Sequence, residues 1–221
     1  MMSSEIEISL FPIPGSVSLP FHTVPLHVFE PRYRKMVRDS VEQKRRIGIA
    51  HTIREIAPAK VSMGAIDHEI LNSNLESYEA HTIFSAGFAK ISEVLPDGRL
   101  IVEIEMDSRY EMIEEVQQIP YKVVKCVPYQ DVEIAPKTSD LLRKKLDLQL
   151  LNLEGPGIAA LKKFLLRDSW TSQSTDQYSF AIFSLIQLKA DFMQMVLEMK
   201  SAEDRITFLL DLFEHKTSFD N

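Results

Sequence analysis

The residues best equipped for chemistry are the cations between positions 32 and 46. This segment holds Arg32, Arg34, Lys35, Arg38, Lys44, Arg45 and Arg46 against Asp39 and Glu42, which is seven minus two, or +5. Because the whole chain carries −7, the remainder carries −12. Such a segment can attract RNA or an acidic protein surface. We favour a solvated helix face whose cations pair with acidic neighbours, since its aromatic residue, Tyr33, is expected to face inward and cannot stack on bases. Nucleic-acid binding is therefore the alternative and not the leading interpretation.

The other reactive side chains form no recognisable catalytic or metal-binding pattern. No two of the six histidines have metal-ligand spacing on a predicted helix. Ser16 and Ser18 lack the G-x-S-x-G nucleophile elbow, and no glycine is followed by lysine, so a Walker A loop is absent. Cys126 lies in an apolar segment typical of a buried structural thiol. We predict no catalytic residues, no metal, no cofactor and no enzyme activity.

The composition gives weaker information about where the protein works. The first residues contain neither a basic region nor a long apolar run, so a signal peptide is not expected. No segment has the roughly 20 apolar residues of a membrane helix. One cysteine allows no intrachain disulfide, which fits a reducing compartment. We expect a cytoplasmic protein without a membrane partner; its oligomeric state is open.

Helix-breaking residues divide the chain. All eleven prolines lie at or before Pro156, and all seven glycines lie at or before Gly157. The final residues therefore have the composition of a helical segment, whereas the earlier ones have the breaks of short strands and loops. We predict an α+β protein with a β subdomain over residues 1–135 and a helical bundle over residues 136–221.

Several strands are expected in the first part. Residues 5–10 and 24–29 fit strands, with Pro25 at the start of its strand or on an edge. Pro31 fits the first turn of a helix whose buried face carries Tyr33, Met36, Val37 and Val41. Residues 47–50, 100–106, 110–115 and 121–127 read as further strands, and residues 95–100 as a hairpin tip. Residues 52–80 are expected to form a long loop with a strand or two. Such a set indicates a small barrel or a sandwich.

Alternation also assigns faces to the strand at residues 100–106. Its apolar residues, ending with Met106, should be buried, and its acidic residues, including Glu103 and Glu105, should point to solvent. These two carboxylates could form a catalytic pair, but a solvated sheet face explains them better.

The second part has readable helices. Ser139 can cap a helix to Leu153, a short helix follows Gly157, and Ser174 with Gln177 forms a capping box. Ser201 with Asp204 begins the last helix. Another helix carries Phe192, Met195, Val196 and Met199 on one face. Its methionines, with Met193, could line an adaptable peptide groove, but a buried core stripe is the favoured interpretation.

The stretch from Leu10 to Val37 resembles the N-terminal substrate-binding domain of ATP-dependent Lon proteases. The most specific part is Phe-Glu-x-Arg-Tyr-Arg at residues 29–34. The further matching residues are Leu10, Phe11, Pro12, Val17, Leu19, Pro20, residues 25–28, residues 35–37, Gly87, Ile91, residues 95–99, Arg109, Tyr110, Pro120, Tyr121, residues 194–198 and Arg205. The resemblance covers nearly the whole chain.

Three departures concern particular positions. Met106 stands where the family commonly has glycine, and Phe88 stands where it has threonine. The Phe-Pro-Gly loop of the family is replaced by Leu19-Pro20-Phe21-His22. These changes put the conformation of that loop in question and leave the fold expectation unchanged.

The resemblance implies a PUA-like small β-barrel with one helix, followed by a helical bundle. It implies binding of an unfolded or specific protein or peptide, without the ATPase and peptidase domains of Lon, so we expect a stand-alone binding module. Leu19, Phe21 and His22 are the candidate peptide contacts. The motif residues Phe29, Glu30, Arg32, Tyr33, Arg34 and Arg109 are expected to be structural. The Glu30 side chain should satisfy both the helix start and nearby arginines.

Overall fold

The chain forms two compact units. The computed structural model describes residues 5–57, 77–132, 136–155, 158–186 and 188–217. The first unit comprises Met1–Gln130 with Leu188–Leu197, and the second comprises Asp131–Gln187 with Glu198–Asn221. The boundary predicted between residues 135 and 136 falls beside residues 133–135, outside the described residues. The prediction placed all of residues 136–221 in the helical bundle, whereas the structure assigns Leu188–Leu197 to the first unit.

The first unit is built on a six-stranded sheet whose pairings close into a ring. Its strands are β1 (Ile6–Pro12), β2 (Thr23–Val28), β3 (Arg46–Ala50), β6 (Ile83–Val94), β7 (Leu100–Gln117) and β8 (Lys122–Pro128). Their order is β2-β7-β6-β3-β1-β8, and β7 also pairs with β8. Among the described residues, the ring thus contains every strand of this sheet except β2, which pairs with β7 alone and places Pro25 on an edge strand, one of the two positions predicted for it.

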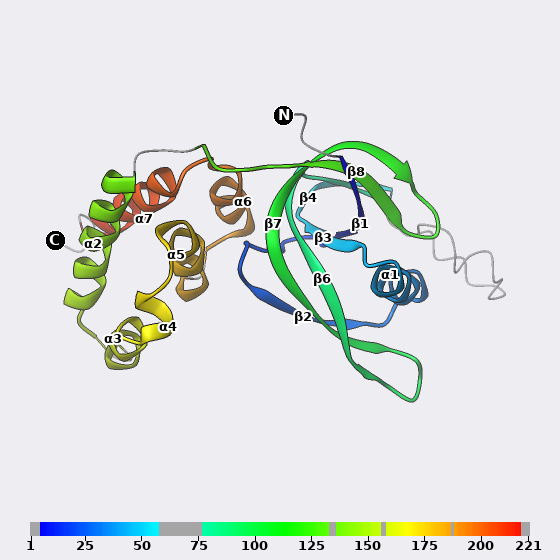
Figure 1. Ribbon diagram of the computed structural model, residues 1–221, viewed down its shortest axis with the longest axis horizontal. Helices are drawn as coiled ribbons and strands as arrows, with labels where there is room; N and C mark the ends of the chain where they lie inside the picture. The colour runs from blue at the N-terminus through cyan, green and yellow to red at the C-terminus, as the bar shows by residue number, and fades with distance from the viewer. Residues whose placement is uncertain (1–4, 58–76, 133–135, 156–157, 187, 218–221) are drawn as a thin grey trace. The chain divides into compact units, whose positions relative to one another are not determined.

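The long strand β7 makes this closure possible. It pairs with β2, β6 and β8 along its 18 residues, and Figure 1 shows its long curved path. Register shifts in its pairing with β6 and β8 mark irregularities of the kind that bend strands. The two strands predicted at residues 100–106 and 110–115 are therefore one strand. The predicted hairpin tip is present, because Gly98, at φ 82°, donates its N–H to the Leu95 carbonyl at 2.8 Å.

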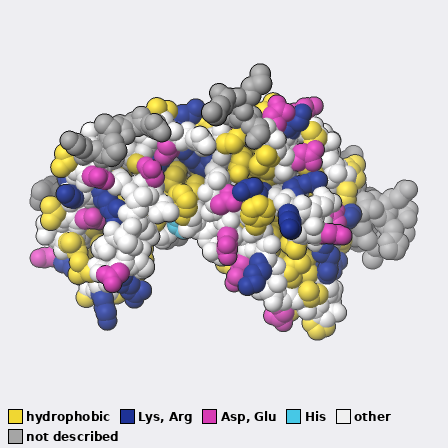
Figure 2. Space-filling model, in the orientation of Figure 1, with side chains coloured by type: hydrophobic (Ala, Val, Ile, Leu, Met, Phe, Trp, Pro, Cys, Tyr) yellow, Lys and Arg dark blue, Asp and Glu magenta, His cyan; other side chains and the backbone are white. Residues whose placement is uncertain are grey.

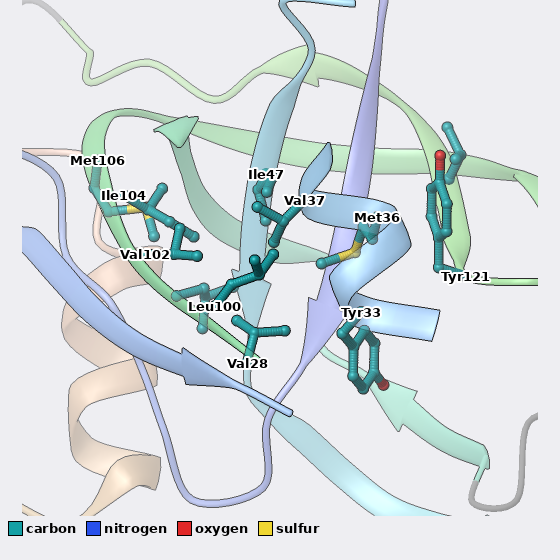
Figure 3. Packing of buried hydrophobic residues seen from close by; sticks show 12 residues of the cluster. Val28, Tyr33, Met36, Val37, Ile47, Leu100, Val102, Ile104, Met106 and Tyr121 are labelled. Atoms are coloured by element: carbon teal, nitrogen blue, oxygen red, sulfur yellow. The ribbon is translucent and has the colours of Figure 1, made fainter. Parts of the chain in front are cut away.

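A helix and the inward face of β7 form much of the core. The helix α1 spans Pro31–Glu42 and buries Tyr33, Met36 and Val37. Figure 3 shows these residues with Leu100, Val102, Ile104 and Met106, which all belong to one buried cluster. The predicted burial of all four β7 residues is confirmed. Burying each such side chain contributes about 1.5–3 kcal/mol.

The prediction for Val41 was wrong. Val41 is 41% exposed, and Ser40 is buried instead, with its hydroxyl donating to the Ser9 hydroxyl at 2.9 Å. Helical geometry explains the exchange, since residue 40 lies only about 20° around the helix from Tyr33, whereas residue 41 lies about 80° away.

A separate two-stranded sheet pairs β4 (Thr52–Ala57) with β5 (Ser77–Ala80). These strands agree with the strand or two expected between residues 52 and 80. Residues 58–76, where the long loop was expected, lie outside the described residues.

The second unit is helical. Its helices are α2 (Pro136–Asn152), α3 (Ile158–Leu165), α4 (Asp168–Thr171), α5 (Thr175–Ala181), a 3₁₀ helix η2 (Ile182–Leu185) and α7 (Ala202–Thr217). The predicted capping box is present, with the Gln177 N–H donating to the Ser174 hydroxyl at 3.3 Å. The helix expected to begin at Ser139 begins instead at Pro136, a residue suited to a first helical turn.

A buried arginine joins several segments of the second unit. Arg205 on α7 is 0% exposed, and its guanidinium donates to Asp131 at 3.0 Å and to the Ser179 hydroxyl at 2.9 Å. It also stacks 3.8 Å from the centre of the Phe180 ring. Because a buried cation without partners is costly, this network of partners makes Arg205 a structural residue of the unit.

Helix α6 (Ala190–Glu198) packs differently from the prediction. It buries Gln194, Val196 and Leu197, whereas Phe192 is 42% and Met195 50% exposed. Gln194 donates its side-chain N–H to the Ile83 carbonyl at 2.9 Å. The favoured interpretation of a buried methionine stripe is therefore wrong for Met195.

Candidate functional site

A surface pocket of about 350 Å³ lies on the outer side of the sheet in the first unit. Its lining comes from three segments: the loop before β2 with the first residue of β2, the middle of β6 and the middle of β7. The lining residues are Phe21, His22, Thr23, Phe88, Glu105, Met106 and Asp107.

The first wall of the pocket is held by backbone hydrogen bonds. The Phe21 N–H donates to the Met106 carbonyl at 2.7 Å, and the Met106 N–H donates to the His22 carbonyl at 2.9 Å. Phe21 has a φ of 65°, which is unusual for a bulky residue. The His22 ring nitrogen Nδ1 lies 3.0 Å from the Pro20 carbonyl oxygen. These contacts fix the loop against β7 while the Phe21 side chain stays 51% exposed.

The middle of β7 forms the adjoining part of the pocket. Met106 is 2% exposed and belongs to the interior cluster. Because side chains alternate along a strand, the flanking Glu105 and Asp107 project outward.

Phe88 on β6 is the other aromatic residue that lines the pocket. It pairs with Glu105 in the sheet register and is 44% exposed. The preceding residue, Gly87, has no room for a side chain, because an added Cβ would meet the Glu105 carbonyl carbon at 2.5 Å. Glycine at this position therefore allows β6 and β7 to approach closely where Phe88 enters the pocket.

One arginine holds two of the lining residues. The Arg46 guanidinium lies 4.3 Å from the centre of the Phe88 ring. It also donates to both carboxylate oxygens of Asp107, with Nη2–Oδ2 at 3.0 Å. Such a cation–π contact combined with a forked ion pair holds the two side chains in place. Glu105 has no ion-pair partner among the residues that the structure describes, so Glu105, Asp107 and Arg46 together carry one uncompensated negative charge.

The structure separates the three predicted peptide contacts. Phe21 and His22 line the pocket, whereas Leu19 is 4% exposed and does not. Phe88 and Glu105 were not among the predicted contacts. Phe88 had a sequence signal, since it replaces the threonine of the Lon pattern, but Glu105 looked like an ordinary solvent-facing strand residue.

The predicted role of Glu30 is half correct. It occupies the N-cap position of α1 but makes no capping hydrogen bond with its side chain. Instead it accepts from Arg32 Nε at 2.9 Å, and Arg32 stacks 4.6 Å from the Tyr33 ring centre. Tyr33 in turn stacks on Phe11 with ring centres 4.1 Å apart. This end of the helix is therefore held by its arginine and aromatic contacts.

The other motif residues have different surroundings. Phe29 is 62% exposed and does not line the pocket. Arg34 donates to the Asp97 carbonyl in the β6–β7 turn at 3.3 Å. Arg109 is 5% exposed, donates to the Leu197 carbonyl and lies 5.0 Å from the Tyr129 ring centre. Arg34 and Arg109 thus each join distant segments of the first unit.

The basic segment uses most of its charge within the fold. Four of its cations pair with carboxylates: Arg32 with Glu30, Lys35 with Asp39, Arg45 with Glu7, and Arg46 with Asp107. Figure 2 shows basic and acidic side chains interspersed on the visible face. This arrangement agrees with the favoured interpretation of paired charges.

Cys126 is 0% exposed, and burial raises the pKa of its thiol to about 12. The thiol is therefore protonated at neutral pH, as a structural residue would be. Within the described residues, no group of three or more His, Cys, Asp or Glu side chains is arranged to hold a metal ion. In the same part of the chain, every helix is too short or too polar to cross a membrane.

Two solved structures share this arrangement of strands and helices. The N-terminal domain of Mycobacterium avium complex Lon protease matches with a TM-score of 0.63 and 10% identity, covering 93% of this chain and 97% of that one. A Lon N-terminal domain protein from Xanthomonas campestris matches with a TM-score of 0.56 and 20% identity, covering 93% and 98%. The chain thus has the α+β fold of Lon N-terminal domains.

The family follows from the sequence itself. The family model described as the ATP-dependent protease La (LON) substrate-binding domain matches residues 7–215. The chain therefore belongs to this family, a family of substrate-binding and not catalytic modules, and the resemblance predicted from residues 10–37 is confirmed. No curated protein matches the chain in a sequence comparison.

Proposed function

We propose that this protein is a non-catalytic module that binds unfolded or extended polypeptides by taking an apolar side chain between Phe21 and Phe88. The observation that carries the proposal is the pocket itself, which is lined by two half-exposed phenylalanines, one in the loop bonded to β7 and one on β6. Membership in a substrate-binding family supports a protein ligand.

The energetics of Phe21 favour binding over a packing role. A phenylalanine that is half exposed gains only part of the burial free energy available to it. Its φ of 65° adds a cost of about 1–3 kcal/mol. Aromatic side chains that stay exposed at a concave site are typical anchors for a partner.

The proposal places this activity in a reducing compartment such as the cytoplasm. Its support is the single, buried Cys126, which offers no intrachain disulfide.

An array of short overlapping peptides, followed by fluorescence anisotropy on the peptides that bind, tests the proposal. Phe21→Gly is the better truncation because glycine accepts a positive φ without strain. We expect Phe21→Gly and Phe88→Ala each to weaken peptide binding by about tenfold. Each removes an aromatic contact that the bound ligand would bury, worth about 1.4 kcal/mol or more.

Phe29→Ala is the matched control, because Phe29 is more exposed than either residue and does not line the pocket. Its affinity should equal that of the unaltered protein. An array without any binding peptide, or equal affinities for all three variants, would contradict the proposal.

A further inference from the structure

We infer that the pocket selects polypeptides in which the apolar side chain is directly followed or preceded by lysine or arginine, with Glu105 as the residue that attracts the cation. This inference rests on the proposed function, because it concerns the chemistry of the same pocket.

The first support is the charge balance along the outer face of β7. Glu103, Glu105 and Asp107 project from this face in succession. Asp107 is neutralised by Arg46 in a forked ion pair, and Glu103 lies opposite Lys90 in the sheet register. Glu105 is the central one of the three.

The second support is what lies beside Glu105. Its register partners are Thr23 on β2 and Phe88 on β6, which carry no charge. Since opposite charges across a sheet offset each other and uncharged neighbours do not, the negative charge of Glu105 is available to a ligand. Glu105 also lines the pocket, so that charge is located where the ligand would lie.

The third support is the match between this pocket and a long cationic side chain. Lysine and arginine have apolar stems and charged ends. The neighbouring apolar side chain of the ligand lies between Phe21 and Phe88, and the long stem of the lysine or arginine lets its charge reach Glu105 in the same pocket. An acidic residue at the same place in the ligand would instead be repelled by the Glu105 carboxylate.

The test uses two fluorescein-labelled peptides, Gly-Ser-Lys-Phe-Leu-Lys-Ser-Gly and Gly-Ser-Glu-Phe-Leu-Glu-Ser-Gly, with anisotropy measured at low and high salt. The unaltered protein should bind the lysine peptide about three- to tenfold more tightly than the glutamate peptide, as expected for partly exposed charges that change from attraction to repulsion. The ratio should shrink as salt is added.

Substitutions on β7 assign the preference to one residue. Glu105→Gln should reduce the ratio, and Glu105→Lys should reverse it. Glu103→Gln is the matched control, because it removes the same charge from the same strand face outside the pocket lining, and it should leave the preference unchanged.

The outcomes separate this inference from the function it rests on. Equal binding of the two peptides, or a lysine preference that survives in Glu105→Lys, would overturn the charge selection. The proposed function would still stand in that case if Phe21→Gly weakened the binding of both peptides. Failure of both peptides to bind, or binding unaffected by Phe21→Gly, would overturn the proposed function together with the inference.

Discussion

Replacing the buried Gly87 by alanine should destabilise the first unit more than replacing Gly15, which has open space at its Cβ position. An added Cβ would lie 2.5 Å from the Glu105 carbonyl carbon and 2.8 Å from the Met106 Cα, with the Glu105 carbonyl oxygen nearer still. Ordinary contact begins at 3.4 Å, so β6 and β7 must separate by at least about 0.9 Å at this point. Backbone hydrogen bonds do not survive a displacement of that size.

The magnitude follows from what the displacement disturbs. Loss of two backbone hydrogen bonds costs roughly 2 kcal/mol. Movement of Met106, which is 2% exposed, also disturbs the core and the two hydrogen bonds that hold Phe21 and His22. We expect a total of about 3–4 kcal/mol, at the upper end of single-residue effects. For a chain of this length that lowers Tm by roughly 6–16 °C.

The assay must report on the first unit. The one tryptophan, Trp170, belongs to the second unit, so its fluorescence serves as a reference. Hydrogen exchange of the β6 and β7 amides in increasing urea, read by mass spectrometry, follows the first unit.

The matched control is Gly15→Ala. Gly15 has nothing within 4 Å of an added Cβ, but its φ is +69°. Alanine there suffers only backbone strain of about 1–2 kcal/mol. If Gly87→Ala left the β6 and β7 amides as protected as in Gly15→Ala, the reasoning from close strand approach would be refuted.

Three further outcomes test the structural assignments. Glu30→Ala should lower Tm by about 2–4 °C, because Arg32, 9% exposed, loses its carboxylate partner at a cost of about 1 kcal/mol; an unchanged melting curve with lost peptide binding would instead give Glu30 a binding role. Burial, together with the 2.7 Å hydrogen bond to Asp39, raises the pKa of Tyr121 from 10.0 to about 12. The stabilisation from neutral Tyr121 is therefore present below pH 10 and lost as pH rises toward 12. Urea denaturation should show the free energy of unfolding falling more steeply with alkaline pH in the unaltered protein than in Tyr121→Phe. Parallel plots of this free energy against pH for the two proteins would contradict the assignment. Cys126 should react with iodoacetamide only after unfolding in urea, as mass spectrometry can show, because burial raises its pKa to about 12; rapid labelling of the folded protein would refute its burial.

Local alternation predicted the inward face of β7 well and its length poorly. The pattern from Leu100 to Met106 is regular because one face is buried, and such a pattern needs no knowledge of distant residues. Arg109 and Tyr110 interrupt it, since both are 5% exposed although adjacent. A single strand continues through them because β8 pairs with the far end of β7, with Tyr110 opposite Pro128. That long-range pairing has no local signal.

The error on α6 has a similar cause. Apolar periodicity selected Met195 for burial, but Met195 is 50% exposed and Gln194 is 3% exposed. The Gln194 side chain donates to the Ile83 carbonyl, so a polar contact with a distant strand decides which face of this short helix is buried. A pattern of apolar residues cannot predict such a contact.

The candidate site was only partly predictable, and the reason lies in what surrounds each residue. The loop at residues 19–22 was predicted to contact peptides because of its apolar side chains, and the structure places Phe21 and His22 of that loop in the pocket. The alternation of apolar and acidic residues correctly predicted that Glu105 faces outward. It could not tell that Phe88 and Thr23 would be its neighbours, because the register of three strands decides that.

Phe21 combines two features that are each unfavourable to folding. It has a φ of 65° and stays 51% exposed. The two backbone hydrogen bonds with Met106 hold the loop in place, yet a glycine would allow the same backbone without strain. The phenylalanine side chain is therefore not required by the backbone conformation, and what it adds is a second aromatic ring beside Phe88 in the pocket lining. Strain and exposure that both oppose stability, in a side chain that lines a concave site, support the proposal that Phe21 contacts a ligand.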